Sequence, residues 1–148
     1  MDRKFYIAYG SNLNLEQMSN RCPTAKVVGP AVLKHYRLLF RGARAGAVAD
    51  VEPFKGGTVP VLVWEITPAD EAALDRYEGW PFLYRKENIK VRIDGKTITA
   101  MIYLMNNARG LGSPSCYYYS VILEGYRSAG FDVDILRTAV SDSVEEES

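Results

Sequence analysis

The stretch FYIAYGSNLNLEQM, residues 5–18, decides how the start of the chain folds. Its apolar run FYIA predicts a first strand, and Leu15 and Met18 are spaced for one face of a helix. YGSNL, residues 9–13, is therefore predicted to be a strand-to-helix turn. Gly10 can adopt backbone angles closed to other residues, so consecutive N–H groups of this turn can converge on an anion at a helix N-terminus.

A second segment, LDRYEG at residues 74–79, predicts the end of a helix that carries an acid. The helix is expected to start at TPAD, residues 67–70, which combines an N-cap hydroxyl, a first-position proline and an acid three residues after the cap. Gly79 is typical of the residue that follows a helix. Glu78 then lies near the negative end of the helix dipole and between aromatic neighbours. Such surroundings tend to raise a carboxyl pKa, which suits a residue that transfers protons.

Composition narrows the classes of partner. A chain of 148 residues is the size of one domain with a real core. Its 18 basic and 18 acidic residues balance, so nucleic acid is not an expected partner. The two cysteines lack CxxC spacing, and the sequence shows no signal-peptide pattern. Its apolar runs are far shorter than the about 20 residues of a membrane span. These features predict a cytoplasmic protein with no membrane partner. The single histidine, His35, excludes sites built on several histidines, and its alternation with apolar neighbours predicts a structural or surface role.

The remaining patterns predict strands and helices in a mixed order. The expected strands cover residues 5–8, 25–40 (one strand, or two interrupted at Gly29-Pro30), 48–51, 59–66, 85–93 and 97–105. A tight turn is expected at Gly56-Gly57 and a hairpin turn at Asp94-Gly95. Later helices are expected to begin at residues 113–115 and after residue 132, with Gly130 between them.

These elements predict an α+β fold, a single small domain with a curled, barrel-like mixed sheet of about six strands and three to four helices. The domain is expected to span residues 1–142, followed by an acidic, disordered tail at residues 143–148. The order of the strands stays open.

Taken together, the segments resemble the γ-glutamylcyclotransferase-like family, whose members include AIG2-like and γ-glutamylamine cyclotransferase-like proteins. The matching segments keep their order over almost the whole chain. They are YGSNL, RCP at residues 21–23, VLVWEIT before the central helix, LDRYEG, Tyr84, AMIYLM at residues 100–105, and PSCYY followed by Ile122 and Gly125.

The resemblance implies an enzyme that cyclises the γ-glutamyl group of a γ-glutamyl amine or peptide to 5-oxoproline and releases the free amine. It implies no cofactor and no metal. Carried over residue by residue, it makes Glu78 the general acid/base. The substrate-binding residues it implies are Tyr9, Gly10, Ser11, Asn12, Leu13, Tyr84 and Tyr118.

The chemistry leaves several assignments open. The YGSNL turn can hold either the oxyanion that develops on the γ-carbonyl or the α-carboxylate of the substrate. A non-catalytic module that binds γ-glutamyl or amino-acid-like ligands, and an amide hydrolase, are the alternative functions. The identity of the amine and the oligomeric state are not predicted. The loops at residues 41–44 and 106–112 are expected to line the amine side.

Overall fold

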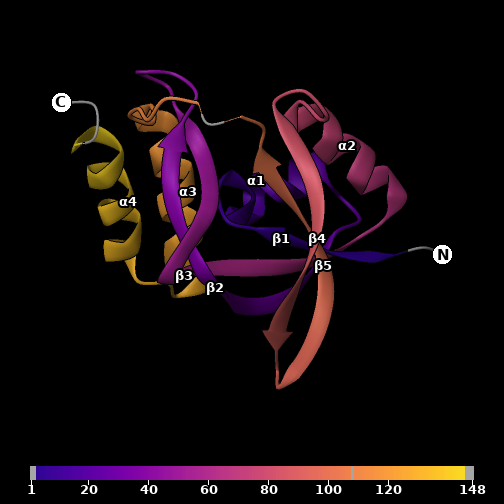
Figure 1. Ribbon diagram of the computed structural model, residues 1–148. Helices are drawn as coiled ribbons and strands as arrows, with labels where there is room; N and C mark the ends of the chain where they lie inside the picture. The colour runs from indigo at the N-terminus through magenta and orange to yellow at the C-terminus, as the bar shows by residue number, and fades with distance from the viewer. Residues whose placement is uncertain (1–2, 108, 146–148) are drawn as a thin grey trace.

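The computed structural model describes residues 3–107 and 109–145. In this part of the chain, five strands form one mixed sheet in the order β2-β3-β1-β5-β4, accompanied by four α-helices and one 3-10 turn (Figure 1). The strands are β1 (Lys4–Ala8), β2 (Lys26–Arg41), β3 (Val48–Ile66), β4 (Tyr84–Ile93) and β5 (Lys96–Met105). The helical elements are η1 (Ser11–Leu13), α1 (Leu15–Arg21), α2 (Pro68–Glu78), α3 (Cys116–Ala129) and α4 (Val133–Glu145). The predicted α+β class is confirmed.

The short first strand lies in the middle of the sheet. β1 pairs antiparallel with β3 from Lys4 opposite Ile66 to Ala8 opposite Leu62, and parallel with β5 at Tyr6 and Met101. Of its five residues, the last three, Tyr6 to Ala8, are buried. The chain therefore leaves β1 in the middle of the sheet, and η1 is the first element after it.

The expected sixth strand does not exist among the described residues, because residues 48–51 and 59–66 belong to the single strand β3. The glycine pair at residues 56–57 was predicted to be a tight turn and is instead part of a bulge. Lys34 pairs with Thr58 and Tyr36 with Pro53, so His35 alone lies opposite residues 54–57. Exposed His35 accepts a hydrogen bond from the Gly56 N–H at 3.2 Å, which gives it the predicted structural and surface role.

The sheet curls but does not close into a barrel. β2 and β4 are the two edge strands, and no hydrogen-bonded ladder joins them in the described ranges. They nevertheless approach each other, since a Cβ at Gly29 of β2 would lie 3.5 Å from the Ile93 side chain of β4. Helices α3 and α4 lie beside the β2–β3 ribbon, and α2 lies on the other side of the molecule near β4 (Figure 1).

Local signals set the helix ends as predicted. Thr67 and Asp70 form a capping box at the start of α2, and Gly79 ends this helix with φ 68°. Ser115 caps the start of α3, and Gly130 ends it with φ 76°. Within residues 3–107 and 109–145, none of the helices combines the length and the hydrophobicity needed to cross a membrane.

The last helix corrects the predicted boundary of the tail. α4 continues to Glu145, so residues 143–145 are helical, and residues 146–148 lie outside the described part. Ser143 is fully buried: its hydroxyl accepts the Phe40 N–H of β2 at 2.9 Å and donates to the Ala139 carbonyl at 2.7 Å. The physical reason for the extension is this bond, because it satisfies an otherwise unpaired strand amide.

We predict that Ser143→Ala lowers the free energy of unfolding by about 1–3 kcal/mol, because the buried Phe40 amide loses its acceptor. Ser141→Ala is the matched control, since Ser141 lies on the same helix and is exposed. Urea denaturation of the two variants measures the difference. Equal stability of the two variants would contradict the assigned role of Ser143.

Candidate functional site

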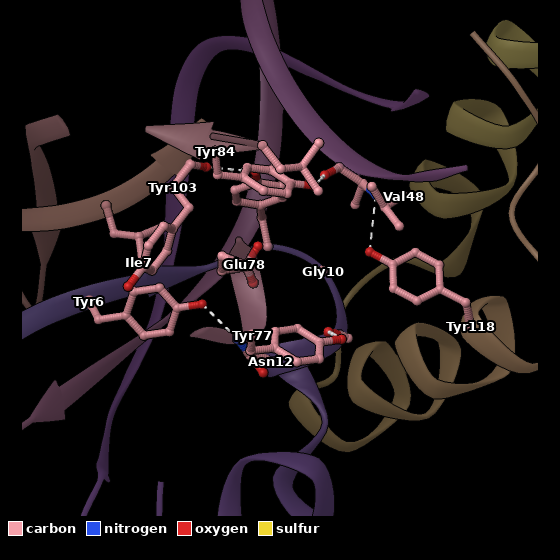
Figure 2. Close-up of a pocket in the computed structure, with 14 residues that line it drawn as sticks. Tyr6, Ile7, Gly10, Asn12, Val48, Tyr77, Glu78, Tyr84, Tyr103 and Tyr118 are labelled. Atoms are coloured by element: carbon pink, nitrogen blue, oxygen red, sulfur yellow. Dashed lines mark hydrogen bonds between the residues drawn. The ribbon is translucent and has the colours of Figure 1, made fainter. Parts of the chain in front are cut away.

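A cavity of about 210 Å³ lies where β1 ends. Residues from β1, η1, β3, α2, β4, β5 and α3 surround it, so the site is assembled from segments far apart in the sequence (Figure 2). The lining residues are Tyr6, Ile7, Tyr9, Gly10, Ser11, Asn12, Val48, Ala49, Tyr77, Glu78, Leu83, Tyr84, Tyr103 and Tyr118.

Glu78, the last residue of α2, is the acid of this cavity. Figure 2 shows its carboxyl group directed into a space bordered by tyrosine side chains. Burial raises the pKa of Glu78 to about 7, and the charge of Arg21 opposes that rise. No described side chain forms a hydrogen bond that contributes to this pKa. The site therefore holds a carboxyl group that exchanges a proton near neutral pH.

The predicted turn forms a single 3-10 turn after β1. The Leu13 N–H donates to the Gly10 carbonyl at 3.0 Å and the Asn14 N–H to the Ser11 carbonyl at 3.1 Å. The first amides of such a turn, those of Ser11 and Asn12, have no acceptor within the turn. Ser11 and Asn12 both line the cavity, and free amides at the start of such a turn are able to bind an anion.

Gly10 is required for space rather than for a left-handed backbone. Its φ is −125°, so the conformational freedom that the sequence suggested is not used as a positive φ. A Cβ at this position would lie 3.2 Å from the Ala49 Cβ and 3.4 Å from the Tyr118 hydroxyl. Any side chain at residue 10 would therefore press on the wall of the cavity.

Side-chain hydrogen bonds fix the turn on both sides. The Ser11 and Tyr77 hydroxyls lie 2.9 Å apart and share a hydrogen bond. The Asn12 side-chain nitrogen donates to the Tyr6 hydroxyl at 2.9 Å, and the Asn12 backbone carbonyl accepts the indole N–H of Trp64 at 3.2 Å. Since Ser11 is held as a partner of a phenol, the geometry does not give it an activating base.

The phenols of the wall are fixed by backbone groups. Tyr84 donates to the Ala49 carbonyl at 2.6 Å, while Tyr118 accepts the Ala49 N–H at 3.0 Å. Tyr9 donates to the Tyr103 carbonyl at 2.7 Å. Burial raises the pKa of all four of these tyrosines above the usual value, so they are neutral near pH 7. Because Tyr118 accepts from Ala49, its own proton remains available to donate to a ligand.

The structure brings most of the predicted site residues together. Seven line the cavity: Tyr9, Gly10, Ser11, Asn12, Glu78, Tyr84 and Tyr118. Leu13 does not, because it is fully buried and packs against α3, where a Cβ at Gly125 would lie 2.7 Å from the Leu13 Cβ. The loops at residues 41–44 and 106–112, which were expected to line the amine side, do not border this cavity; Gly42–Arg44 and Gly110–Leu111 line a separate hollow, and residue 108 is outside the described part.

Sequence reasoning did not assign Tyr6 and Tyr103 to the site. Both lie in apolar strand segments that are typical of core residues. Their rings meet edge to face with centroids 5.8 Å apart because β1 and β5 are parallel neighbours. Their hydroxyl groups were the available signal, since a buried tyrosine in a strand requires a polar partner.

Among residues 3–107 and 109–145, no group of three or more His, Cys, Asp or Glu side chains is placed to hold a metal ion.

Comparison with known proteins relates this site to one family. The profile of the family described as gamma-glutamyl cyclotransferase, AIG2-like, matches residues 6–120. Human gamma-glutamylcyclotransferase is 30% identical over 138 residues, covering 87% of this chain and 73% of the human protein. The mouse gamma-glutamylcyclotransferase is 33% identical over 134 residues, covering 84% and 71%. A solved gamma-glutamyl cyclotransferase structure has a TM-score of 0.80 at 28% identity, covering 93% of this chain and 86% of that one.

We predict that the unpaired acid makes the folded protein less stable at higher pH. The pKa of Glu78 is about 7 in the folded state, against about 4.3 in an unfolded chain. The folded state therefore binds more protons between these two values, and stability falls as the pH rises through this window. At about pH 8, Glu78→Gln should be more stable than wild type by on the order of 1–3 kcal/mol, and at about pH 4 the two should be equal.

Glu71→Gln, on the same helix, is the control for this measurement. Burial raises the pKa of Glu71, but hydrogen bonds to Lys4 and Lys86 outweigh burial and hold it below its usual value. Glu71→Gln should therefore lower the free energy of unfolding at pH values above the pKa of a glutamate in the unfolded chain, whereas Glu78→Gln should raise it. Urea denaturation across the pH range measures both. A Glu78→Gln variant that is less stable than wild type at high pH would refute the raised pKa.

Proposed function

Because the chain belongs to the gamma-glutamyl cyclotransferase, AIG2-like family, we propose that it cyclises the γ-glutamyl group of a γ-glutamyl amine or peptide to 5-oxoproline and releases the free amine. The observation that carries this proposal is Glu78, an unpaired carboxyl group with a pKa of about 7 in a small cavity of neutral phenols. A group that is half ionised near neutral pH is suited to accept one proton and return it.

Glu78 performs both proton transfers in the proposed reaction. Its carboxylate takes a proton from the α-ammonium group of the substrate, and the freed amine attacks the γ-carbonyl carbon. A new C–N bond closes the five-membered lactam. The original amide C–N bond then breaks as the proton held by Glu78 passes to the departing nitrogen. The attacking nitrogen loses a second proton as it becomes the lactam N–H, and this proton passes to the released amine, which leaves as an ammonium ion. The products are 5-oxoproline and the free amine, and the Glu78 carboxylate is regenerated.

The turn and the phenols position the substrate. The Ser11 and Asn12 amides are donors for an anion, either the α-carboxylate or the oxyanion that forms on the γ-carbonyl. Tyr118 adds a hydroxyl donor beside them. Because the nucleophile and the carbonyl belong to one molecule, holding the cyclising conformer is the main task, and effective molarities of about 10⁵ M or more are reached in such reactions.

The size of the cavity supports a small substrate group. Its volume of about 210 Å³ is below the roughly 300–1,000 Å³ of pockets for drug-sized ligands. It suits the γ-glutamyl group alone, so we place the amine half of the substrate outside the cavity. Cys22 and Cys116 are both free thiols, which fits the proposed cytoplasmic location.

A panel of γ-glutamyl amines tests the proposal. Purified protein is incubated with glutathione, γ-glutamyl amino acids and ε-(γ-glutamyl)lysine, with and without a chelator, and products are followed by mass spectrometry. Release of 5-oxoproline together with the free amine, in both arms, is expected. Release of glutamate would indicate a hydrolase, and ligand-induced thermal stabilisation without any product would indicate a binding module.

We predict that Glu78→Gln lowers turnover by about 10²- to 10⁴-fold, the range that general acid/base removal produces. Glutamine keeps the shape and polarity of the side chain, so the folded variant should still bind a γ-glutamyl ligand. Glu87→Gln, an exposed position on β4, is the control and should retain wild-type turnover. Steady-state 5-oxoproline release measures the rates. Near wild-type release by the Glu78→Gln variant would refute the mechanism.

We predict that Gly10→Ala weakens binding of 5-oxoproline and of substrate, because the new methyl group contacts Ala49 and the Tyr118 hydroxyl in the cavity wall. Gly110→Ala is the matched control, since a Cβ there meets no atom within 4 Å. Isothermal titration with 5-oxoproline compares the two. Equal affinity in both variants would show that this wall does not contact the ligand.

A further inference from the structure

Arg21, the last residue of α1, is half-buried and lies behind the cavity rather than in its lining. Its guanidinium group makes three directed contacts. One nitrogen donates to the Asn12 side-chain oxygen at 2.5 Å and another to the Gln17 side-chain oxygen at 2.6 Å. The central carbon lies 3.5 Å from the centre of the Tyr77 ring. These contacts restrain the guanidinium group from three sides.

The contacts join two elements of the site that are far apart in the sequence. Asn12 belongs to the turn η1, and Tyr77 precedes Glu78 at the end of α2. The hydrogen bond between the Ser11 and Tyr77 hydroxyls is the other direct link between the same elements. A planar guanidinium presents its donors in a fixed fork while its face stacks on an aromatic ring, and the compact ammonium of a lysine does not reproduce this geometry.

Arg21 is also the charge that bears on Glu78. The groups facing this carboxyl are phenols: Tyr6 from β1, Tyr9 directly after β1, Tyr84 from β4, Tyr103 from β5, Tyr118 from α3 and Tyr77 from α2 itself. Within the described residues, Arg21 is the one cation that influences Glu78. Lys86, which approaches α2 from β4, is paired instead with Glu71 at 2.8 Å and Asp75 at 3.1 Å.

We propose that Arg21 is a positioning residue for the Glu78 chemistry: its guanidinium group holds the turn at Asn12 against the helix end at Tyr77 and supplies the positive charge that faces the Glu78 carboxyl. The inference rests on the proposed function in that it assigns the acid/base role to Glu78. Arg21 does not touch the substrate, and acts by fixing two walls of the cavity and by balancing the effect of burial on the acid.

Two substitutions separate these two actions. Arg21→Met removes the charge and the hydrogen bonds but keeps an extended chain that can lie on Tyr77. Arg21→Lys keeps a positive charge and loses the two-pronged contact with Asn12 and Gln17. Arg76→Met is the matched control, because Arg76 is an exposed cation in the same helical turn as Glu78. Two readouts are used: the Glu78 titration followed by carbon-13 NMR without substrate, and the pH profile of kcat/KM for 5-oxoproline release.

In Arg21→Met, the Glu78 titration and the acidic limb of kcat/KM should move together to higher pH by about 1 unit, because an opposite charge nearby favours ionisation. In Arg21→Lys, the titration should stay near that of wild type while KM rises, since the turn is no longer clamped. Arg76→Met should change neither quantity. A purely structural role for Arg21 would lower thermal stability without moving the titration.

A Glu78 titration that is the same in Arg21→Met as in wild type overturns the proposal, and so does an Arg76→Met shift of equal size. Failure of the proposed function is distinguished by the products. If no γ-glutamyl amine yields 5-oxoproline, the reaction assignment fails, whereas the NMR titration still decides the role of Arg21.

Discussion

The pairing of β1 on both of its edges is the constraint on which the site depends. This strand of five residues pairs with β3 on one side and β5 on the other. Its end therefore delivers η1 to the centre of the sheet rather than to an edge. The parallel contact with β5 places Tyr103 beside Tyr6, and Ala49 reaches the cavity from the start of β3, where it pairs with Phe40 of β2. The cavity is thus a consequence of strand order.

The residues that line the cavity shield the Glu78 carboxyl group from water, and none of the others carries a charged side chain. Most acids of α2 have partners: Glu71 and Asp75 both bind Lys86, and Asp75 also accepts the Tyr103 hydroxyl at 2.6 Å. Glu78, at the end of the same helix, faces phenols that each take part in a hydrogen bond with a backbone group or a side chain. Buried polar groups need partners, and the tyrosines obtain theirs from the fold. Among the described side chains, none forms a hydrogen bond with the Glu78 carboxyl group.

Sequence patterns that depend on a few neighbouring residues predicted the local structure correctly in most cases. The capping box at Thr67, the C-terminal Gly79 and the turn at Asp94-Gly95 all formed as expected, because each is determined by neighbouring residues. The long strand β3 was divided wrongly, since nothing local shows that residues 54–57 form a bulge held against β2. The tail boundary failed for a similar reason, because the burial of Ser143 depends on a contact with Phe40 more than 100 residues away.

The same contrast between local patterns and long-range contacts applies to the residues of the site. Resemblance to a family identified Glu78 and six residues around it, but Leu13 in the same motif belongs to the core, because η1 turns its side chain toward α3 at Gly125. Tyr6 and Tyr103 required knowledge that β1 and β5 are parallel neighbours, which a single sequence does not contain.

One physical cause connects the proposed reactivity of Glu78 with the predicted cost of its burial in stability. A carboxyl group removed from water and left without an ion pair favours its protonated form, and this raises its pKa toward neutrality. The same preference makes the ionised form unfavourable in the folded state. Arg21 limits the effect from outside the cavity, where its hydrogen bonds go to Asn12 and Gln17 rather than to Glu78. A direct salt bridge would stabilise the fold more but hold the carboxylate ionised, and the acid would then return its proton less readily.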